Sequence, residues 1–357
     1  MDGPASVTFI SGKAEVFGLR LTNRCRMIVR EGKRLPFTIL ETATFDIALG
    51  KDSAATEIDG TTIPLTWQST LTTFRKTQTQ PATVMIIGGV DSGKSSLCTY
   101  LANRLANEHC RVAVLDEDLG QSDIGPPCTV AFGIITNPVT DLFNVKPENV
   151  VFVGVTSPSE APDKTVQAAA ALATDVRAKA DFIIVNTDGW TLGDDAVAFK
   201  KRLAEAVKPD LIFFLQHGGE PICLPVLFKE ALADFEFELV DAPPVVRERN
   251  REKRRSLREL GFVKYLENAR VRVFPLSHIV VEGERRNMLF QQGEAENLLV
   301  GLHDVKKRFL GIGIIRGVDF VRKSLRVFTA VEEKPGILVL GRLRLDKNLR
   351  EIPKINE

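Results

Sequence analysis

Apolar and polar positions follow three different patterns along the chain. Up to about residue 76, short runs of β-branched and aromatic residues alternate with glycine and charged turns, which predicts a small β-sandwich or barrel. Apolar runs then alternate with helix-like stretches, the pattern of a parallel α/β sheet. Beyond Gly261, β-like runs return. The expected fold is a multidomain α/β protein, whose central parallel sheet is flanked by an N-terminal β-sandwich-like domain and a C-terminal β-rich domain.

The same runs predict the element boundaries. The N-terminal runs are 7–10, 14–18, 26–29 and 37–40. The predicted central strands are 84–87, 111–115, 150–153, 182–185 and 211–215, and the predicted helices are 95–107, 163–178, 196–206 and 224–233. The C-terminal runs are 271–274, 279–281, 309–315, 324–328 and 336–340. A polar linker at 75–81 and a charged stretch at 245–259 separate these patterns. We therefore expect an N-terminal β domain at 1–76, an α/β domain at 77–244, an arginine-rich segment at 245–266 and a β-rich domain at 267–357.

A glycine-rich motif follows the first central strand. Residues 88–95 fit G-x-x-x-x-G-K-[ST], and a helix-like run comes next. Strand, glycine loop and helix in this order indicate a phosphate-binding P-loop, because the glycines let consecutive N–H groups point at phosphate oxygens and the helix start adds its positive dipole end. We expect Lys94 to reach the β/γ-phosphates and the Ser95 hydroxyl to bind Mg²⁺. The predicted ATP-binding residues are Gly88, Gly89, Val90, Asp91, Ser92, Gly93, Lys94, Ser95 and Ser96.

Carboxylates follow the second central strand, at the sheet edge where ligands bind in open α/β folds. Asp116 and Asp118 alternate with Glu117, so in an extended chain the two aspartates share one face. They are candidates for the magnesium shell, and for accepting a proton from an attacking hydroxyl. The alternative is an acidic turn that faces solvent. Gln121 lies further along the same loop and is placed to orient a polar substrate group.

Two more loops are expected at this edge. Thr156 follows the third predicted strand, and Asn186 to Trp190 follow the fourth. Trp190 is a candidate to stack on a nucleobase, a contact worth about 1–3 kcal/mol, whereas the alternative is a tryptophan of the core. Asn186-Thr187-Asp188 lacks the lysine and the spacing of a guanine-reading Asn-Lys-x-Asp motif, which argues against a GTPase.

The charged stretch contains six arginines against three acidic residues between positions 247 and 259. Arginines 247, 251, 254/255 and 258 recur at helical spacing and form one basic stripe. Such a helix can close over a triphosphate and supply positive charge in the transition state. The alternative is a solvated helix with i,i+3 ion pairs such as Glu248–Arg251.

Composition limits which partners and which cellular compartment we expect for this protein. The formal net charge of +1 gives no overall attraction to nucleic acid or membrane, so any polyanion site depends on local clustering. The five cysteines are scattered without C-x-x-C spacing, which predicts neither a zinc site nor a disulfide framework. No basic-then-apolar leader is present, and no apolar run approaches the ~18 residues of a membrane span. We expect a cytoplasmic protein with no membrane contact.

Taken together, these motifs resemble those of the P-loop polynucleotide 5′-hydroxyl kinases. This family includes the RNA kinase of the mRNA 3′-end cleavage factor and tRNA splicing complex, nucleolar pre-rRNA processing kinases and archaeal RNA kinases. Six segments carry the resemblance in order: 12–18, 88–96, 116–121, 156–158, 187–193 and the R-x-x-x-x-R-R motif at 249–255. The compact length is most similar to archaeal members. Ser96 stands where threonine is more usual, and the N-terminal extension of eukaryotic members is not seen.

The resemblance implies an N-terminal β domain, a kinase domain and a C-terminal domain, with ATP and Mg²⁺ as cofactors. It implies transfer of the γ-phosphate of ATP to the 5′-OH end of RNA, possibly of DNA; protein partners stay open. The implied catalytic residues are Lys94, Asp118, Arg249 and Arg254, the metal-binding residues are Ser95, Asp116 and Asp118, and the substrate-binding residues are Gln121, Thr156 and Trp190. One alternative is a non-catalytic, ATP-bound scaffold subunit of an RNA-processing complex. Another is a kinase or ATPase acting on small molecules.

Overall fold

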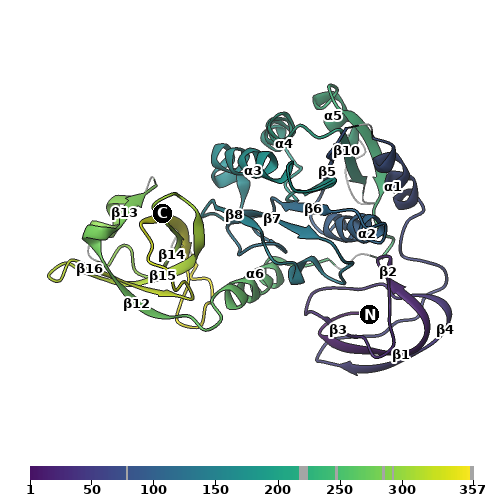
Figure 1. The fold of residues 1–357 in the computed structure, drawn as a ribbon, viewed down its shortest axis with the longest axis horizontal. Helices are drawn as coiled ribbons and strands as arrows, with labels where there is room; N and C mark the ends of the chain where they lie inside the picture. The colour runs from purple at the N-terminus through teal and green to yellow at the C-terminus, as the bar shows by residue number, and fades with distance from the viewer. Residues whose placement is uncertain (78, 217–223, 246–247, 284–285, 292, 354–357) are drawn as a thin grey trace.

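Three β-sheets organise the computed structural model, which describes residues 1–77, 79–216, 224–245, 248–283, 286–291 and 293–353. In Figure 1 the N-terminal sheet lies at the lower right, the central sheet and its helices lie in the middle, and the C-terminal sheet lies at the left. The multidomain α/β fold class is confirmed. No helix in the described ranges has the length and apolar character needed to cross a membrane.

The N-terminal sheet is built around one long strand, β1 (Ala5–Val16), which pairs antiparallel with all of its neighbours. These are β2 (Leu19–Arg20), β3 (Arg26–Val29) and β4 (Thr38–Leu49). The predicted strands at 7–10 and 14–18 are thus continuous. Register shifts against β4 between Phe9 and Ala14 bend β1, and Gly12 takes a φ of 104° within the bend. Because of this bend, β1 continues as one strand through a segment in which buried and exposed side chains no longer alternate.

Helix α1 (Thr66–Lys76) corrects the predicted β structure of this region. It buries Trp67, Leu71 and Phe74, which recur at i, i+4 and i+7 on one helical face. Trp67 contacts Tyr100 and Phe74 contacts Phe182, both residues of the central domain. The helix lies in the range 1–76, yet it packs on the central sheet (Figure 1).

The central sheet has seven strands in the order β11-β10-β5-β9-β6-β7-β8. They are β5 (Ala82–Gly88), β6 (Val112–Asp116), β7 (Thr129–Ile135), β8 (Asn149–Phe152), β9 (Phe182–Asn186), β10 (Leu211–Gln216) and β11 (Glu236–Asp241). Pairs among the first five strands in this order are parallel, but β7 is antiparallel to both β6 and β8. The sheet is therefore mixed, and β7 and β11 were not predicted. The strand β7 is a continuous apolar run without alternation, and β11 alternates Glu with apolar residues at the sheet edge.

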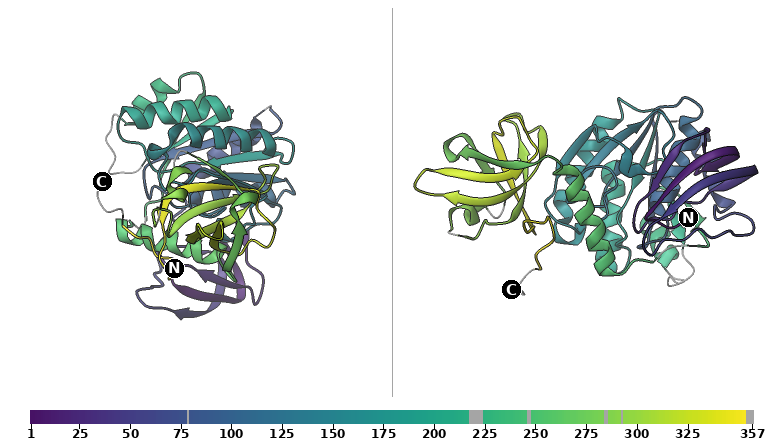
Figure 2. Two further views of the ribbon diagram at one scale, coloured as in Figure 1. Left: turned by 90° about the vertical axis from the view of Figure 1, so that its left-hand side faces the viewer. Right: turned by 90° about the horizontal axis from the view of Figure 1, so that it is seen from below.

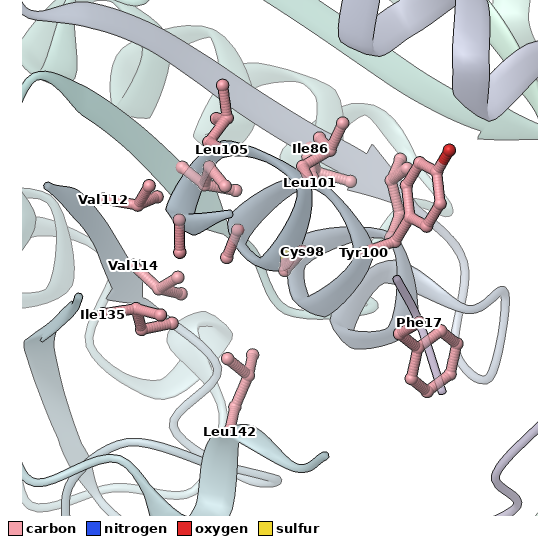
Figure 3. Packing of buried hydrophobic residues seen from close by; sticks show 14 of the residues in the cluster. Phe17, Ile86, Cys98, Tyr100, Leu101, Leu105, Val112, Val114, Ile135 and Leu142 are labelled. Atoms are coloured by element: carbon pink, nitrogen blue, oxygen red, sulfur yellow. The ribbon is translucent and has the colours of Figure 1, made fainter. Parts of the chain in front are cut away.

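Helices cover both faces of this sheet, which is why its central strands are buried throughout. They are α2 (Lys94–Ala106), α3 (Pro162–Val176), α4 (Asp194–Val207) and α5 (Leu224–Ala231). Alternate residues of β5 enter two separate cores: Ile86 packs toward α2, and Ile87 toward α3 and α4. Figure 3 shows the first core, where Leu101 and Leu105 of α2 face apolar side chains of the sheet.

The C-terminal sheet follows α6 (Arg251–Tyr265) and has six strands in the order β12-β16-β15-β14-β17-β13. Its strands are β12 (Arg270–Pro275), β13 (Val280–Glu282), β14 (Leu298–His303), β15 (Phe309–Asp319), β16 (Ser324–Thr329) and β17 (Ile337–Arg344). All pairs are antiparallel except β13 with β17. Only β14 was not predicted. Short 3₁₀ helices lie at η1 (Leu142–Asn144), η2 (Pro158–Glu160), η3 (Leu276–His278) and η4 (Arg286–Phe290).

Helix α6 joins the three parts of the molecule. The right-hand view of Figure 2 shows it running along the central domain from the C-terminal sheet toward the N-terminal sheet. Lys253 pairs with Glu31 beside β3, and Arg258 pairs with Glu351 of the C-terminal tail. The helix is thus held from both sides, at the edge of the central sheet where the predicted site residues lie.

Candidate functional site

A cleft of about 1360 Å³ lies between the carboxyl ends of the central strands, the N-terminal sheet and the start of α6. It brings together segments that are far apart in the sequence. The predicted site residues that line it are Val90, Asp91, Ser92, Gly93, Lys94, Ser95, Ser96, Asp118, Gln121, Thr156, Trp190, Arg249 and Arg254. Gly88, Gly89 and Asp116 do not line it. Every predicted catalytic residue therefore faces one cavity.

The P-loop has the geometry that its sequence predicts. Gly93 has a φ of 99°, and α2 begins at the next residue. The buried ammonium of Lys94 donates to the carbonyl oxygens of Gly88 at 2.9 Å and Gly89 at 2.6 Å. Burial lowers the pKa of Lys94, and the nearby Asp118 carboxylate opposes this shift. The hydroxyl of Ser92 is buried and has no hydrogen-bond partner within the described ranges, so the loop offers a donor that suits a phosphate oxygen.

Asp118, unlike Asp116, lines the cleft. Its Oδ1 accepts the backbone N–H groups of Gly120 at 3.0 Å and Gln121 at 2.8 Å, which fixes the side chain at the end of β6. Burial raises its pKa, with the negative charge of Asp188 acting in the same direction. A carboxylate whose pKa is raised toward neutrality is a better proton acceptor at physiological pH.

Asp116 has a different role from Asp118, and the prediction that the two aspartates share one face is wrong. The Asp116 carboxylate is fully buried. Its Oδ2 accepts the N–H groups of Asp123 at 2.7 Å and Ile124 at 2.9 Å, and its Oδ1 accepts from Asn186 at 2.9 Å. Burial raises its pKa to about 7. The chain turns directly after β6, so the buried Asp116 holds the loop through hydrogen bonds to its N–H groups while Asp118 faces the cleft.

Gln121 connects the loop after β6 to α6. Its side-chain amide donates to the carbonyl oxygen of Arg254 at 3.0 Å and to that of Gly120 at 2.7 Å. The residue lines the cleft as predicted, and its amide also anchors the helix that carries the arginines.

Thr156 and Trp190 lie on two loops at the same edge. The Thr156 loop closely approaches the loop after β6, since a Cβ at Gly120 would lie 2.8 Å from the carbonyl oxygen of Thr156. Trp190 is half-buried and stacks on Phe199 of α4, with ring centroids 5.6 Å apart. It packs against the core and also lines the cleft.

The two predicted catalytic arginines, Arg249 and Arg254, both contact the P-loop; we call them the lid arginines, and the segment that carries them the lid. Arg249 donates from Nε to Oδ1 of Asp91 at 2.6 Å and from its backbone N–H to Oδ2 at 2.9 Å. Arg254 lies 3.7 Å from the same Oδ2. Asn250 caps α6 by accepting the N–H of Lys253 at 2.8 Å. Arg247, the first member of the predicted stripe, lies outside the described residues.

A buried lysine supports the loops behind the site. Lys200 of α4 forms an ion pair with Asp188, and its Nζ lies 3.5 Å from Oε2 of Glu117. Burial alone lowers the pKa of Lys200, but the two carboxylates outweigh it and the net shift is upward. Burial raises the pKa of Glu117 to about 8. Because Glu117 precedes Asp118 and Asp188 lies two residues before Trp190, this network fixes two cleft-lining loops together.

Several cleft-lining residues were not among the predicted site residues. Arg251 and Arg258 of α6 line the cleft, as do aromatic residues of the N-terminal part such as Phe37 and Phe45. The first two belong to the basic stripe that helical spacing predicted, although no site role was given to them individually. The alternation along β4 could have placed Phe45 on an inward face, but no local pattern says that this face opens toward the P-loop.

Comparison with known proteins agrees with this geometry. A family model described as mRNA cleavage and polyadenylation factor CLP1 P-loop matches residues 88–268. The chain is 28% identical over 327 residues to a polyribonucleotide 5′-hydroxyl-kinase of Pyrococcus furiosus, covering 76% of this chain and 90% of the relative. It is 26% identical over 331 residues to a polyribonucleotide 5′-hydroxyl-kinase of Methanocaldococcus jannaschii, covering 78% and 91%.

Solved structures show the same fold over nearly the whole chain. The structure of the wild-type Clp1p–Pcf11p complex superposes with a TM-score of 0.75 at 16% identity, covering 96% of this chain and 94% of the other. A second structure, which concerns the extended interface between Pcf11p and Clp1p, gives a TM-score of 0.76 at 15% identity. The likeness therefore extends beyond the P-loop domain to the arrangement of all three sheets.

Proposed function

Because this chain belongs to the CLP1 P-loop family of mRNA cleavage and polyadenylation factors, we propose that it is an ATP-dependent polynucleotide 5′-hydroxyl kinase. It transfers the γ-phosphate of ATP to the 5′-OH end of RNA. One observation carries this assignment: a phosphate-binding lysine, a cleft-facing carboxylate and two arginines, from three distant segments, line a single cavity. Relatives that match 76–78% of the chain are named polyribonucleotide 5′-hydroxyl-kinases, which supports RNA as the substrate class.

The P-loop and its surroundings hold the triphosphate. Backbone N–H groups of 88–94 and the buried Ser92 hydroxyl donate to phosphate oxygens, and Lys94 moves its ammonium from the loop carbonyls to the β/γ-phosphates. The Ser95 hydroxyl and the Asp118 carboxylate are hard oxygen donors that suit Mg²⁺. Bound there, Mg²⁺ would neutralise negative charge that develops on the phosphates. Asp116 supports this site through the loop, since both of its oxygens already accept hydrogen bonds.

Transfer requires positioning and charge more than covalent chemistry, because the transition state of phosphoryl transfer is loose. Asp118 accepts the proton of the 5′-hydroxyl as that oxygen bonds to the γ-phosphorus, while the bond from the γ-phosphorus to the β–γ bridging oxygen breaks and ADP leaves. Lys94, Arg249 and Arg254 stabilise the charge on the transferring group. Trp190 stacks on the terminal base and Thr156 holds the end of the chain, so a polynucleotide end fits where a small alcohol would lack both contacts.

The scaffold alternative is less favoured by the structure. A non-catalytic subunit has no need of a carboxylate that has a raised pKa and lies beside the P-loop lysine. The pKa of Asp118 is raised, and its charge acts on Lys94. The predicted catalytic side chains all reach the cleft, with none replaced or turned away.

Label transfer from γ-labelled ATP to a 5′-OH RNA oligonucleotide tests the assignment of roles. We expect Lys94→Ala and Arg254→Ala to abolish transfer while the thermal unfolding midpoint stays close to that of the wild type. Arg322→Ala is a matched control, because this exposed arginine lies in the turn between β15 and β16 of the C-terminal sheet. Activity close to wild type in either cleft variant would contradict the roles given to these residues.

A further inference from the structure

Asp91 occupies an unusual position for a negative charge. It lies inside the phosphate-binding loop, between Gly88 and Lys94, where an anionic ligand is to be bound. Its side chain is only 8% exposed. Both carboxylate oxygens are directed at the lid: Oδ1 accepts Nε of Arg249 at 2.6 Å, Oδ2 accepts the backbone N–H of Arg249 at 2.9 Å, and Arg254 approaches Oδ2 at 3.7 Å.

Helix α6 does not depend on Asp91 for its place. The Lys253–Glu31 ion pair joins it to the N-terminal part. Arg258 donates to both carboxylate oxygens of Glu351, at 2.6 Å and 2.8 Å. Gln121 in addition donates to a carbonyl oxygen of the helix at 3.0 Å. When the arginine side chains leave Asp91, the helix therefore stays, and the change needs only new side-chain rotamers.

We propose that Asp91 is a built-in competitor of the triphosphate, which holds the two lid arginines until phosphate takes them over. This rests on the proposed function only in that the arginines face the phosphates of ATP. Before nucleotide binds, the Asp91 carboxylate neutralises the arginines and keeps them over the P-loop. When the triphosphate binds, its oxygens compete for the same guanidinium groups. Asp91 is thus a positioning residue that weakens nucleotide binding in exchange for pre-placed arginines.

The direction in which ATP binding changes when Asp91 is replaced distinguishes a competitor from a carboxylate that only supports the loop. A carboxylate that merely supports the loop would, when removed, loosen ATP binding. A competitor for Arg249, when removed, tightens it. Asn is a suitable replacement, because Asp91 has a φ of 59° and asparagine is among the residues that best tolerate the left-handed region. The amide oxygen of Asn can still accept the backbone N–H of Arg249 while the charge is lost.

Calorimetric titration of the full chain with ATP and Mg²⁺, without RNA, tests the proposal. We expect Asp91→Asn to lower the Kd for ATP by about threefold to tenfold, the range of a charged contact of this exposure. In an Arg249→Gln background, where Asp91 keeps only the 3.7 Å approach of Arg254, the same change should lower the Kd by less than twofold. Asp91→Ser serves as a second variant, and thermal unfolding without nucleotide verifies that each variant is folded.

Glu31→Gln is the matched control, since it also removes an acid that pairs with α6, but away from the P-loop. We expect it to leave the Kd for ATP unchanged. A Kd that is unchanged or raised in Asp91→Asn would overturn the proposal. Equal tightening in the Arg249→Gln background would also overturn it, because the effect would then be direct repulsion between Asp91 and phosphate. Since no RNA is present, a failure of the kinase assignment would appear only in label transfer.

Discussion

Replacing the buried Lys200 by methionine tests how the loops behind the cleft are held. The lysine side chain has no exposed surface, and it lies between Asp188, with which it pairs directly, and Glu117, whose Oε2 is 3.5 Å away. Methionine keeps most of the volume and removes the charge. Glu117 is buried as well, and burial raises the pKa of its carboxyl. The substitution therefore leaves the Asp188 carboxylate buried without its cation.

The expected cost follows from this uncompensated charge. Removing one partner of a buried ion pair destabilises a protein by about 3–5 kcal/mol, and we expect a loss in this range at pH 7.5.

Urea unfolding followed by tryptophan fluorescence measures this loss for the relevant domain. The chain has two tryptophans, and both pack on the central domain: Trp67 against Tyr100, and Trp190 against Phe199. The signal thus reports this domain even where the three parts of the chain do not unfold together.

Lys179→Met is the matched control. This lysine pairs with Asp175 at 3.0 Å, but both side chains are more than a third exposed, so its loss should cost less than about 1 kcal/mol. A loss below about 1 kcal/mol for Lys200→Met at pH 7.5 would refute the reasoning.

Three further predictions concern the cleft and its frame. Asp118→Asn should lower kcat by about 10²- to 10⁴-fold in the label-transfer assay while the unfolding midpoint is retained; a loss of less than tenfold would argue against a general base. Trp190→Ala should raise KM for RNA at least about tenfold and change KM for ATP little, and equal changes in both would indicate a purely structural residue. Arg30→Gln removes a cation that bonds Asp123 at 2.9 Å and Asp141 at 2.6 Å, and should cost about 3 kcal/mol in urea unfolding at pH 7. Burial alone would raise the pKa of Asp123, but its cations hold it below the ordinary value, so this stabilisation exists above about pH 4 and fades as the pH falls; a gap that widens in acid would contradict it.

The chemistry of the P-loop was predictable because it is local. Strand, turn and helix are adjacent in sequence, so the motif alone placed Lys94 and Ser95 correctly at the start of α2. Asp118 and Trp190 were found for a similar reason, since each follows a recognisable apolar strand. The position of Arg254 came from helical spacing within one segment.

Contacts between distant segments were not predictable in this way. Asp116 is buried whereas Asp118 lines the cleft. This difference depends on how the chain turns after β6, where the loop folds back over the Asp116 carboxylate. Asp91 and Arg249 are 158 residues apart, and no local pattern pairs them. Helix α1 was missed because Thr, Ser and Gln separate its three buried apolar residues and mask the helical period.

Phosphate transfer to matched oligonucleotides tests the central claim most directly. The full chain is incubated with γ-labelled ATP, Mg²⁺ and RNA or DNA strands of one sequence, each with either a 5′-OH or a 5′-phosphate end. The account predicts label on 5′-OH RNA and none on the 5′-phosphorylated strands, with the ratio of RNA to DNA labelling giving the substrate preference. ATP that stays bound while no strand is labelled would contradict the account and would identify a nucleotide-bound scaffold.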